Sequence, residues 1–151
     1  MNKSTNSITI LVADDDHEDC MLIKEAFNEN RLVNNLIFVN DGEMLIQYLK
    51  HEGQFADQTT HPRPGLILLD LNMPKKDGRE ALKEIKQDPK LKDIPVVVFT
   101  TSKAEEDIFK TYNLGVNSFI TKPVTFDSLV SITKDLGHYW FQLVELPKHH
   151  S

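Results

Sequence analysis

The sequence predicts an α/β protein built on a doubly wound, five-stranded parallel sheet with helices on both faces. Five short apolar runs have the length and composition of buried strands, and stretches with the apolar spacing of amphipathic helices alternate with them. Strands that alternate with helices in this way run parallel and are joined by right-handed crossovers. The five predicted strands are residues 8–13, 35–40, 66–69, 94–99 and 116–121.

The predicted helices follow these runs, and most of them begin at a recognisable signal. Asp16 is expected to cap the first helix and Ser102 the fourth, because their side chains can accept backbone N–H groups of a first helical turn. The later helices are predicted at residues 43–51, 80–87, 103–112 and 125–136, with 137–146 prolonging the last one. The polar stretch 52–64 is interpreted as a surface loop in which His61 is solvated rather than a ligand.

Length, charge and cysteine content narrow the class of protein. The chain has 151 residues, a formal net charge of −6 and one cysteine. This length fits one domain, and the negative charge argues against a general nucleic-acid or anionic-membrane surface. No apolar run approaches membrane-spanning length, and a single cysteine excludes a disulfide framework or a thiolate zinc site. We expect a cytoplasmic protein with a flexible N-terminus at 1–7, a domain at 8–136 and an extension at 137–151.

Four of the five strand ends carry polar groups of a matching kind. Asp14 and Asp15 follow the first strand, Asp70 the third, Thr100 the fourth and Lys122 the fifth. Each acid has a simpler explanation, a turn cap or a solvated acidic turn. However, the carboxyl ends of parallel strands lie at one edge of the sheet, where ligands bind in open α/β folds. The second strand is the exception, since it ends in an ordinary Asn–Asp–Gly turn.

This set of side chains favours phosphoryl chemistry. Clustered carboxylates without histidine or cysteine ligands select a hard cation, Mg²⁺ above all. A lysine and a hydroxyl group opposite the metal are partners for a phosphoryl group. A carboxylate can itself accept the phosphoryl group and form an acyl phosphate.

Four motifs in the correct order carry a resemblance to a known family. The motifs are VADDD, LLDLNMP, TTS and TKP, and over residues 8–136 they resemble the receiver domain of two-component response regulators. The resemblance implies a flavodoxin-like fold with strand order 2-1-3-4-5. It also implies a signalling protein that accepts a phosphoryl group from a histidine kinase. Such a protein slowly phosphorylates and dephosphorylates itself and has no other enzymatic activity.

The resemblance also implies roles at the metal and phosphoryl site. Asp70 would be the phosphoacceptor, and Asp15 and Asp70 would bind Mg²⁺ directly. The backbone carbonyl of Asn72 would be a further ligand, whereas Asp14 would act through water. Lys122 would pair with the phosphoryl oxygens.

Further positions match the switch and the residues that tune hydrolysis of the acyl phosphate. Thr100 would move to bond a phosphoryl oxygen, and Phe119 would swing inward with it, although Phe119 also fits a simple core position. Asn72, Thr101 and Ser102 match the tuning positions. Thr101 is bulkier than the alanine common in the family, and Phe119 lacks the hydroxyl group of a tyrosine.

The C-terminal extension is more apolar than a free surface helix requires. Tyr139, Trp140 and Phe141 either form an interface or fold back onto the same chain. The phrase RPGLILLDLNMPKKDGRE and the aromatic tail resemble single-domain regulators paired with phytochrome-like histidine kinases. Those regulators are typically homodimers through the last strand, the last helix and the extension, so the resemblance implies the same arrangement here.

Two other functions remain as alternatives. A haloacid-dehalogenase-like phosphatase also forms an aspartyl phosphate, but that family requires a second aspartate where this chain has Asn72. An adaptor that acts without phosphorylation would be recognised by a lost acid or lysine, and each of these residues is present.

Overall fold

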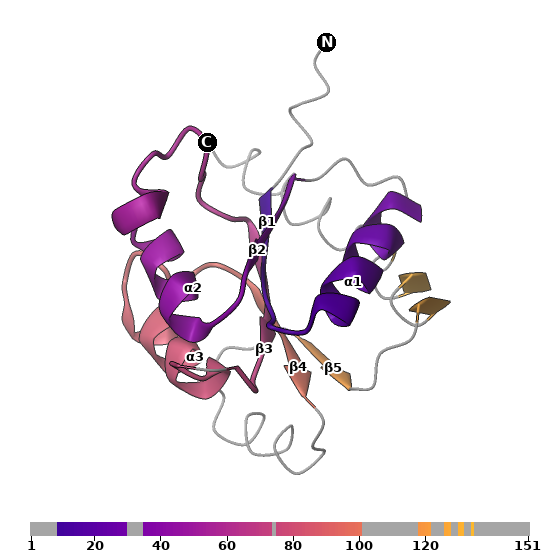
Figure 1. Cartoon of the computed structure of the whole chain (residues 1–151). Helices are drawn as coiled ribbons and strands as arrows, with labels where there is room; N and C mark the ends of the chain where they lie inside the picture. The colour runs from indigo at the N-terminus through magenta and orange to yellow at the C-terminus, as the bar shows by residue number, and fades with distance from the viewer. Residues whose placement is uncertain are drawn as a thin grey trace, which may run out of the picture.

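A five-stranded parallel sheet forms the centre of the molecule (Figure 1). The structure is a computed structural model that describes residues 9–29, 35–73, 75–100 and 118–121, together with residues 126, 127, 130, 131 and 134. Neighbouring strands pair in the order β2-β1-β3-β4-β5, which confirms the order that the family resemblance implied. The strands are β1 (Thr9–Ala13), β2 (Asn35–Val39), β3 (Leu66–Asp70), β4 (Val96–Thr100) and β5 (Ser118–Thr121).

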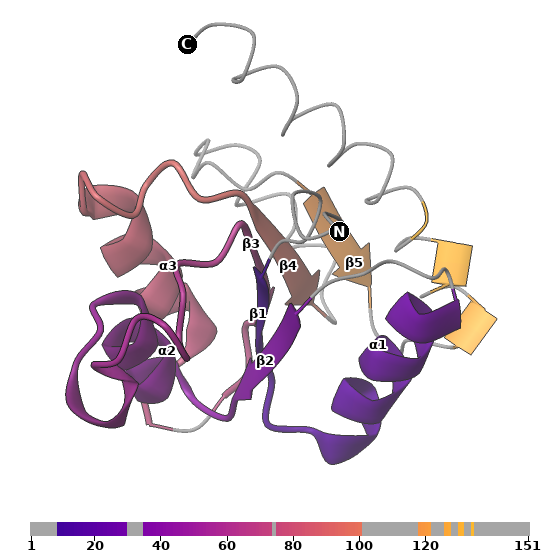
Figure 2. The ribbon, with the colours of Figure 1, turned by 90° about the horizontal axis from the view of Figure 1, so that it is seen from above.

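Helices cover both faces of the sheet, as predicted. Helix α1 (His17–Glu29) lies on one face, and α2 (Gly42–Leu49) and α3 (Gly78–Gln87) lie side by side on the other (Figure 2). Alternate side chains of a strand point to opposite faces, and β1, β2, β3 and β4 each supply side chains to both layers. In β1, for example, Ile10 and Val12 belong to the apolar cluster under α1. The intervening Leu11 and Ala13 belong to the cluster under α2 and α3.

Each of the three helices begins at an aspartate that accepts backbone N–H groups of the first turn, at 2.8–3.3 Å. Asp16 does this for α1, which confirms the predicted cap. Asp41 and Asp77 do it for α2 and α3, and these two helices therefore begin at Gly42 and Gly78, ahead of the predicted starts at residues 43 and 80. The cap satisfies N–H groups that have no partner within the helix, and this lets the helix begin at a glycine.

The loop between α2 and β3 packs more tightly than the sequence suggested. It contains a short 3₁₀ helix, Gly53–Phe55, and the Phe55 side chain is buried. The His61 ring stands edge-on to the Phe55 ring, with a centroid distance of 5.2 Å, and the fully buried Tyr48 donates a hydrogen bond to the Pro62 carbonyl at 2.8 Å. His61 is half-buried, less solvated than the polar composition of the loop suggests, and it belongs to no group of possible metal ligands among the described residues.

The last part of the chain is described only at separate positions. Phe126, Asp127, Val130, Ser131 and Lys134 are helical, within the predicted range 125–136, and Val130 packs against the cluster under α1. The predicted helix at 103–112 and the extension at 137–146 lie outside the described residues. Among the helices of the described part, none is long and apolar enough to cross a membrane.

Candidate functional site

Asp70 is held rigidly at the carboxyl end of a buried strand. All five residues of β3 are buried, and Asp70 itself is 2% exposed. The next residue, Leu71, donates its backbone N–H to the Phe99 carbonyl of β4 at 3.3 Å. One carboxylate oxygen of Asp70 accepts the backbone N–H of Asn72 at 3.1 Å, which turns the chain away from the strand. The carboxylate is therefore fixed by the core of the sheet on one side and by its own loop on the other.

Asp14 and Asp15 follow β1, the strand beside β3. Asp14 is fully buried, and its backbone N–H continues the sheet by donating to the Val39 carbonyl of β2 at 3.1 Å. Its carboxylate accepts the backbone N–H of Asp16 at 2.9 Å. Asp15 is exposed. One acid of the pair thus belongs to the protein interior, and the other faces solvent.

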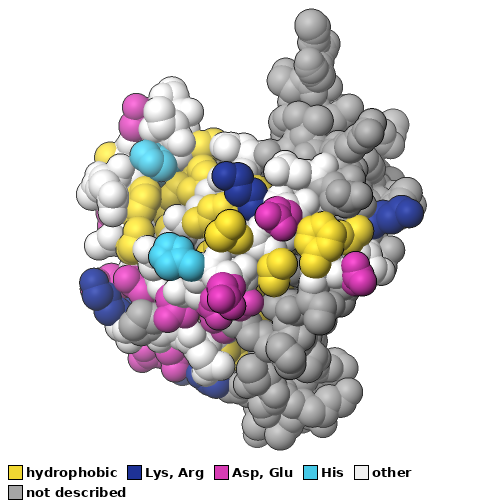
Figure 3. All heavy atoms as spheres, turned by 45° about the vertical axis from the view of Figure 1, so that its right-hand side comes forward, with side chains coloured by type: hydrophobic (Ala, Val, Ile, Leu, Met, Phe, Trp, Pro, Cys, Tyr) yellow, Lys and Arg dark blue, Asp and Glu magenta, His cyan; other side chains and the backbone are white. Residues whose placement is uncertain are grey.

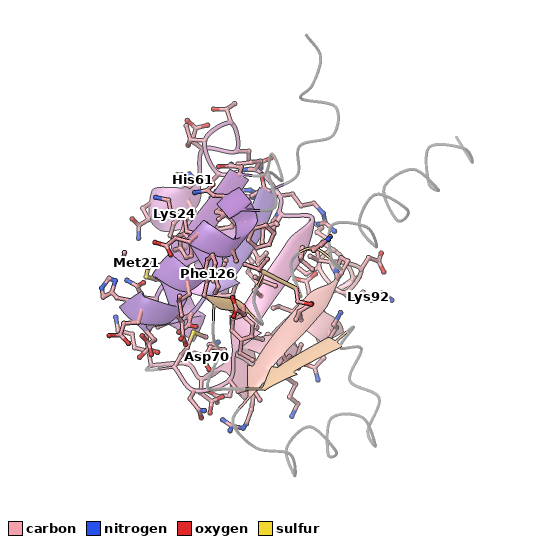
Figure 4. The ribbon with its side chains drawn as sticks, turned by 90° about the vertical axis from the view of Figure 1, so that its right-hand side faces the viewer. Met21, Lys24, His61, Asp70, Lys92 and Phe126 are labelled. Atoms are coloured by element: carbon pink, nitrogen blue, oxygen red, sulfur yellow. The ribbon has the colours of Figure 1, made fainter. Side chains whose placement is uncertain are left out.

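The sheet register brings these acids together. Because Ala13 pairs with Leu69, the following residues of the two strands, Asp14 and Asp70, arrive side by side. One carboxylate oxygen from each of Asp14, Asp15 and Asp70 can be chosen so that all three lie within 4.8 Å of one another. Figure 4 shows Asp70 at one end of the sheet, with His61 toward the opposite end. The convergence expected from the strand ends is therefore present for all three acids.

The donor set fits a hard divalent cation. Three carboxylates this close repel one another in a partly buried site, and a cation between them would reduce the repulsion. Mg²⁺ prefers oxygen ligands and keeps several waters, and the exposed Asp15 leaves one side of the cluster accessible to water. Acidic side chains also gather on the lower part of the face with α1 turned forward, the end at which β1 runs into α1 (Figure 3).

The negative charge at this edge also affects Cys20. Its thiol donates to the Asp14 carbonyl at 3.6 Å. Burial, followed by the charge of Asp14 and its acidic neighbours, raises the pKa of Cys20 to about 12. The thiol therefore stays protonated at neutral pH.

The loop after Asp70 is attached to α3 at its far end. Gly78 donates its backbone N–H to the Leu71 carbonyl at 3.0 Å, and Arg79 reaches the same carbonyl at 3.4 Å. Arg79 also pairs with Asp77, the cap of α3, at 3.3 Å. Asn72 is exposed, whereas the neighbouring Met73 is buried and anchors the loop.

The other predicted site residues are covered only in part. The backbone places Thr100 at the carboxyl end of β4, directly after the residue that pairs with Asp70, and Phe119 lies in β5 in register with Val98. Thr100 thus ends β4 and Phe119 lies two residues before the end of β5, and their switch roles stay predictions. The remaining predicted residues lie outside the described residues: Thr101, Ser102, Lys122, Tyr139, Trp140 and Phe141.

Sequence reasoning missed one contact at the site. The Asp41–Gly42 turn after β2 was interpreted as ordinary, but Gly42 donates its backbone N–H to the Lys76 carbonyl, in the loop that follows Asp70, at 2.9 Å. The cap signal of an aspartate before an apolar helix was present in the sequence and would have located the start of α2. It would not have revealed the contact with the loop, because that contact is tertiary.

Comparisons with known proteins agree with this geometry. The family model described as response regulator receiver domain matches residues 10–134. Response regulator Rcp1 of Synechocystis sp. (strain ATCC 27184 / PCC 6803 / Kazusa) is 42% identical over 138 residues, which cover 91% of this chain and 92% of Rcp1.

Two solved structures extend the comparison. The phosphorylated cyanobacterial phytochrome response regulator RcpA has a TM-score of 0.78 and 45% identity, with 89% of this chain and 94% of RcpA covered. The Mn(2+)-bound form of Rcp1 has a TM-score of 0.75 and 41% identity, with 88% and 94% covered. Since the family model spans most of the chain and Rcp1 matches nearly its whole length, the chain belongs to the response regulator receiver domain family, and its relatives include phytochrome response regulators.

Proposed function

We propose that this chain is a response regulator that accepts a phosphoryl group on Asp70 from a sensor histidine kinase and then changes its contacts with a partner. The observation that carries the proposal is the cluster of three carboxylates within 4.8 Å, two of them buried, at the carboxyl ends of β1 and β3. Such a cluster lowers the stability of the folded protein unless it binds a cation, so its presence indicates a functional site rather than a packing role.

Four residues of the chain would bind Mg²⁺, directly or through water. Asp15 and Asp70 would be direct ligands together with the backbone carbonyl of Asn72, and Asp14 would act through a water molecule. When bound, Mg²⁺ supplies positive charge beside the transferring phosphoryl group. The Mn(2+)-bound relative supports a divalent cation in this family.

The transfer itself requires mainly position and charge. A carboxylate oxygen of Asp70 forms a bond to phosphorus while the bond between phosphorus and the donor's imidazole nitrogen breaks. The imidazole leaves with the electron pair of that bond. Lys122 would offset the negative charge of the phosphoryl oxygens, and the rigid mounting of Asp70 keeps the attacking oxygen in place.

The phosphoryl group would then bias a two-state switch. Thr100 would bond a phosphoryl oxygen, and Phe119 would move inward with it. Thr101, Asn72 and Ser102 would set the lifetime of the acyl phosphate. Each of these roles follows from the family pattern at these positions, and an added dianion is sufficient to bias such a switch.

Phosphorylation is tested on the purified chain with acetyl phosphate or a histidine kinase in the presence of Mg²⁺. We expect one acid-stable, base-labile phosphoryl group, seen as a shifted band on a Phos-tag gel, and Asp70→Asn should abolish it. Equal modification of the wild type and the variant would contradict the assignment of Asp70. Omission of Mg²⁺ should also abolish the shift.

We further propose a cytoplasmic receiver domain at 8–136 that acts through contact with other proteins, with a phytochrome-like histidine kinase as the phosphoryl donor. The last strand, the last helix and the extension at 137–151 would form a homodimer centred on Tyr139, Trp140 and Phe141. Sedimentation tests this interface. Trp140→Ala should lower the mass to that of a monomer, and an unchanged mass would remove the extension from the interface.

A further inference from the structure

The turn between β2 and α2 touches the loop that follows Asp70. The backbone N–H of Gly42 donates to the Lys76 carbonyl at 2.9 Å. Beside this bond, the Lys75 ammonium group lies 3.9 Å from the buried carboxylate of Asp41. Two consecutive residues of the turn therefore contact two consecutive residues of the loop. β1 separates β2 from β3 in the sheet, so this contact joins elements whose strands are not paired.

The approach of the two backbones leaves no room for a side chain at position 42. A Cβ atom added to Gly42 would lie 2.0 Å from the oxygen and 2.8 Å from the carbon of the Lys76 carbonyl. Both obstacles are backbone atoms, which cannot yield as the end of a flexible side chain would. Gly42 is a helical residue without a left-handed backbone conformation, so its glycine is explained by this contact and not by its dihedral angles.

The contact lies in the second half of the loop, which is fixed at both ends. At the first end, Leu71 is bonded to β4, and at the second, Gly78 is bonded back to the Leu71 carbonyl. Gly78 is also packed closely, because a Cβ there would lie 2.4 Å from the Asp70 carbonyl oxygen. Between these ends Lys75 has φ of +61°, a backbone conformation that residues other than glycine rarely adopt. A conformation of this kind persists where its surroundings impose it, and the contact with Gly42 is adjacent to it.

We propose that Gly42 is a positioning residue for the metal site. Its N–H group and its missing side chain fix Lys76 in the loop that leads from Asp70 to α3. Through this loop they would keep the backbone carbonyl of Asn72 in position to bind Mg²⁺. The inference rests on the proposed function, because it takes that carbonyl as a ligand of Mg²⁺. It assigns to the second strand end, which carries no acid or lysine of the site, the task of supporting the loop.

The first test compares two glycine variants of the full chain. Mg²⁺ affinity is measured from amide chemical shifts during titration with MgCl₂, and stability from thermal unfolding. Gly42→Ala should weaken Mg²⁺ binding by about tenfold, the size of effect typical for residues that orient a ligand. Gly53→Ala is the matched control, because Gly53 has φ of +58° but open space around its Cβ position. It should lower the melting temperature and leave Mg²⁺ affinity unchanged.

The second test uses the wild-type chain and does not depend on a variant that folds. If the Gly42–Lys76 bond and the metal site are coupled, Mg²⁺ must strengthen the bond as much as the bond strengthens Mg²⁺ binding. Hydrogen exchange at the Gly42 amide should therefore slow on addition of Mg²⁺ by more than exchange at the Phe55 amide, which is bonded to Glu52 in a different loop.

The outcomes separate this inference from the function on which it rests. If Mg²⁺ shifts the amides of Asp14 and Asp70 but Gly42→Ala binds it as tightly as the wild type, the positioning role is overturned. Equal slowing at the Gly42 and Phe55 amides would also overturn it. If no wild-type amide responds to Mg²⁺, the proposed metal site itself fails, and this inference fails with it.

Discussion

Replacing Asp70 by asparagine should make the metal-free protein more stable while it removes the phosphoacceptor. The asparagine side chain would keep the size of the aspartate and an oxygen that can accept the Asn72 N–H, now 3.1 Å from the Asp70 carboxylate. What the substitution removes is one of three negative charges in the cluster with Asp14 and Asp15. The folded state, which brings the charges together, should gain from this, whereas the unfolded chain should be nearly indifferent.

The size of the gain follows from the separation of the carboxylates. At 4.8 Å, the limit for the three oxygens, two unit charges repel by about 3.5 kcal/mol at an effective dielectric constant of about 20 and by about 0.9 kcal/mol in bulk water. Asp14 is buried with Asp70 and belongs near the higher figure, while the exposed Asp15 belongs near the lower one. Since other contacts of Asp70 offset part of the repulsion, we expect a net gain of about 2 kcal/mol, or about 4–8 °C in melting temperature.

The assay is thermal unfolding, followed by circular dichroism, with EDTA and with millimolar MgCl₂. In EDTA the variant should melt above the wild type. Mg²⁺ should raise the melting temperature of the wild type, because a cation that binds only the folded state adds about 2.7 kcal/mol at about one hundred times its dissociation constant. The variant should gain much less. A variant less stable than the wild type in EDTA would refute the idea that the three charges are held together at a cost.

Two further predictions concern the hydrogen bond between α2 and the loop before β3 and the cap of α1. Tyr48→Phe leaves the Pro62 carbonyl without its 2.8 Å hydrogen bond and should cost about 1 kcal/mol in urea unfolding. Burial raises the pKa of Tyr48 to about 12, above its ordinary value of 10.0. The stabilisation by the protonated phenol is therefore complete below pH 10 and is lost as the pH rises through 12. In a spectrophotometric titration, the tyrosine that ionises near pH 12 should be absent from the variant. Asp16→Ala should lower the free energy of unfolding by about 1 kcal/mol, because it removes the cap of α1. Asp16→Asn should be nearly as stable as the wild type, because asparagine caps a helix equally well. Equal losses of stability in both variants would exclude capping as the cause.

Sequence alone predicted those parts of the fold that depend on local pattern. Residues 66–69 predicted β3 because an uninterrupted apolar run closed by turn residues has few other interpretations, and the strand indeed ends with Asp70. The close approach of Asp14 to Asp70 was also predictable, because parallel pairing alone brings the carboxyl ends of strands to one edge of the sheet. Neither result required knowledge of side-chain packing.

The errors occur where a tertiary contact overrides the local pattern. β4 was predicted from residue 94 but begins at Val96, because Ile94 bonds back to Leu91 in a turn. His61 was expected in solvent because its neighbours are polar, but the rings of Tyr48 and Phe55 pack against it. Polar composition identifies a loop without indicating which of its side chains fold inward.

The Asp41–Gly42 turn shows why one strand end was left out of the predicted site. The predicted site consists of side chains at strand ends, and the residues that follow β2 supply none of them. However, α2 and α3 lie side by side on one face of the sheet, so the start of α2 comes against the loop that leads into α3. The two residues of the turn then meet separate demands: the aspartate caps the helix and attracts Lys75, and the glycine admits the Lys76 backbone. A dipeptide typical of any turn is thus required here twice over, first by the helix that it begins and then by the loop that it supports.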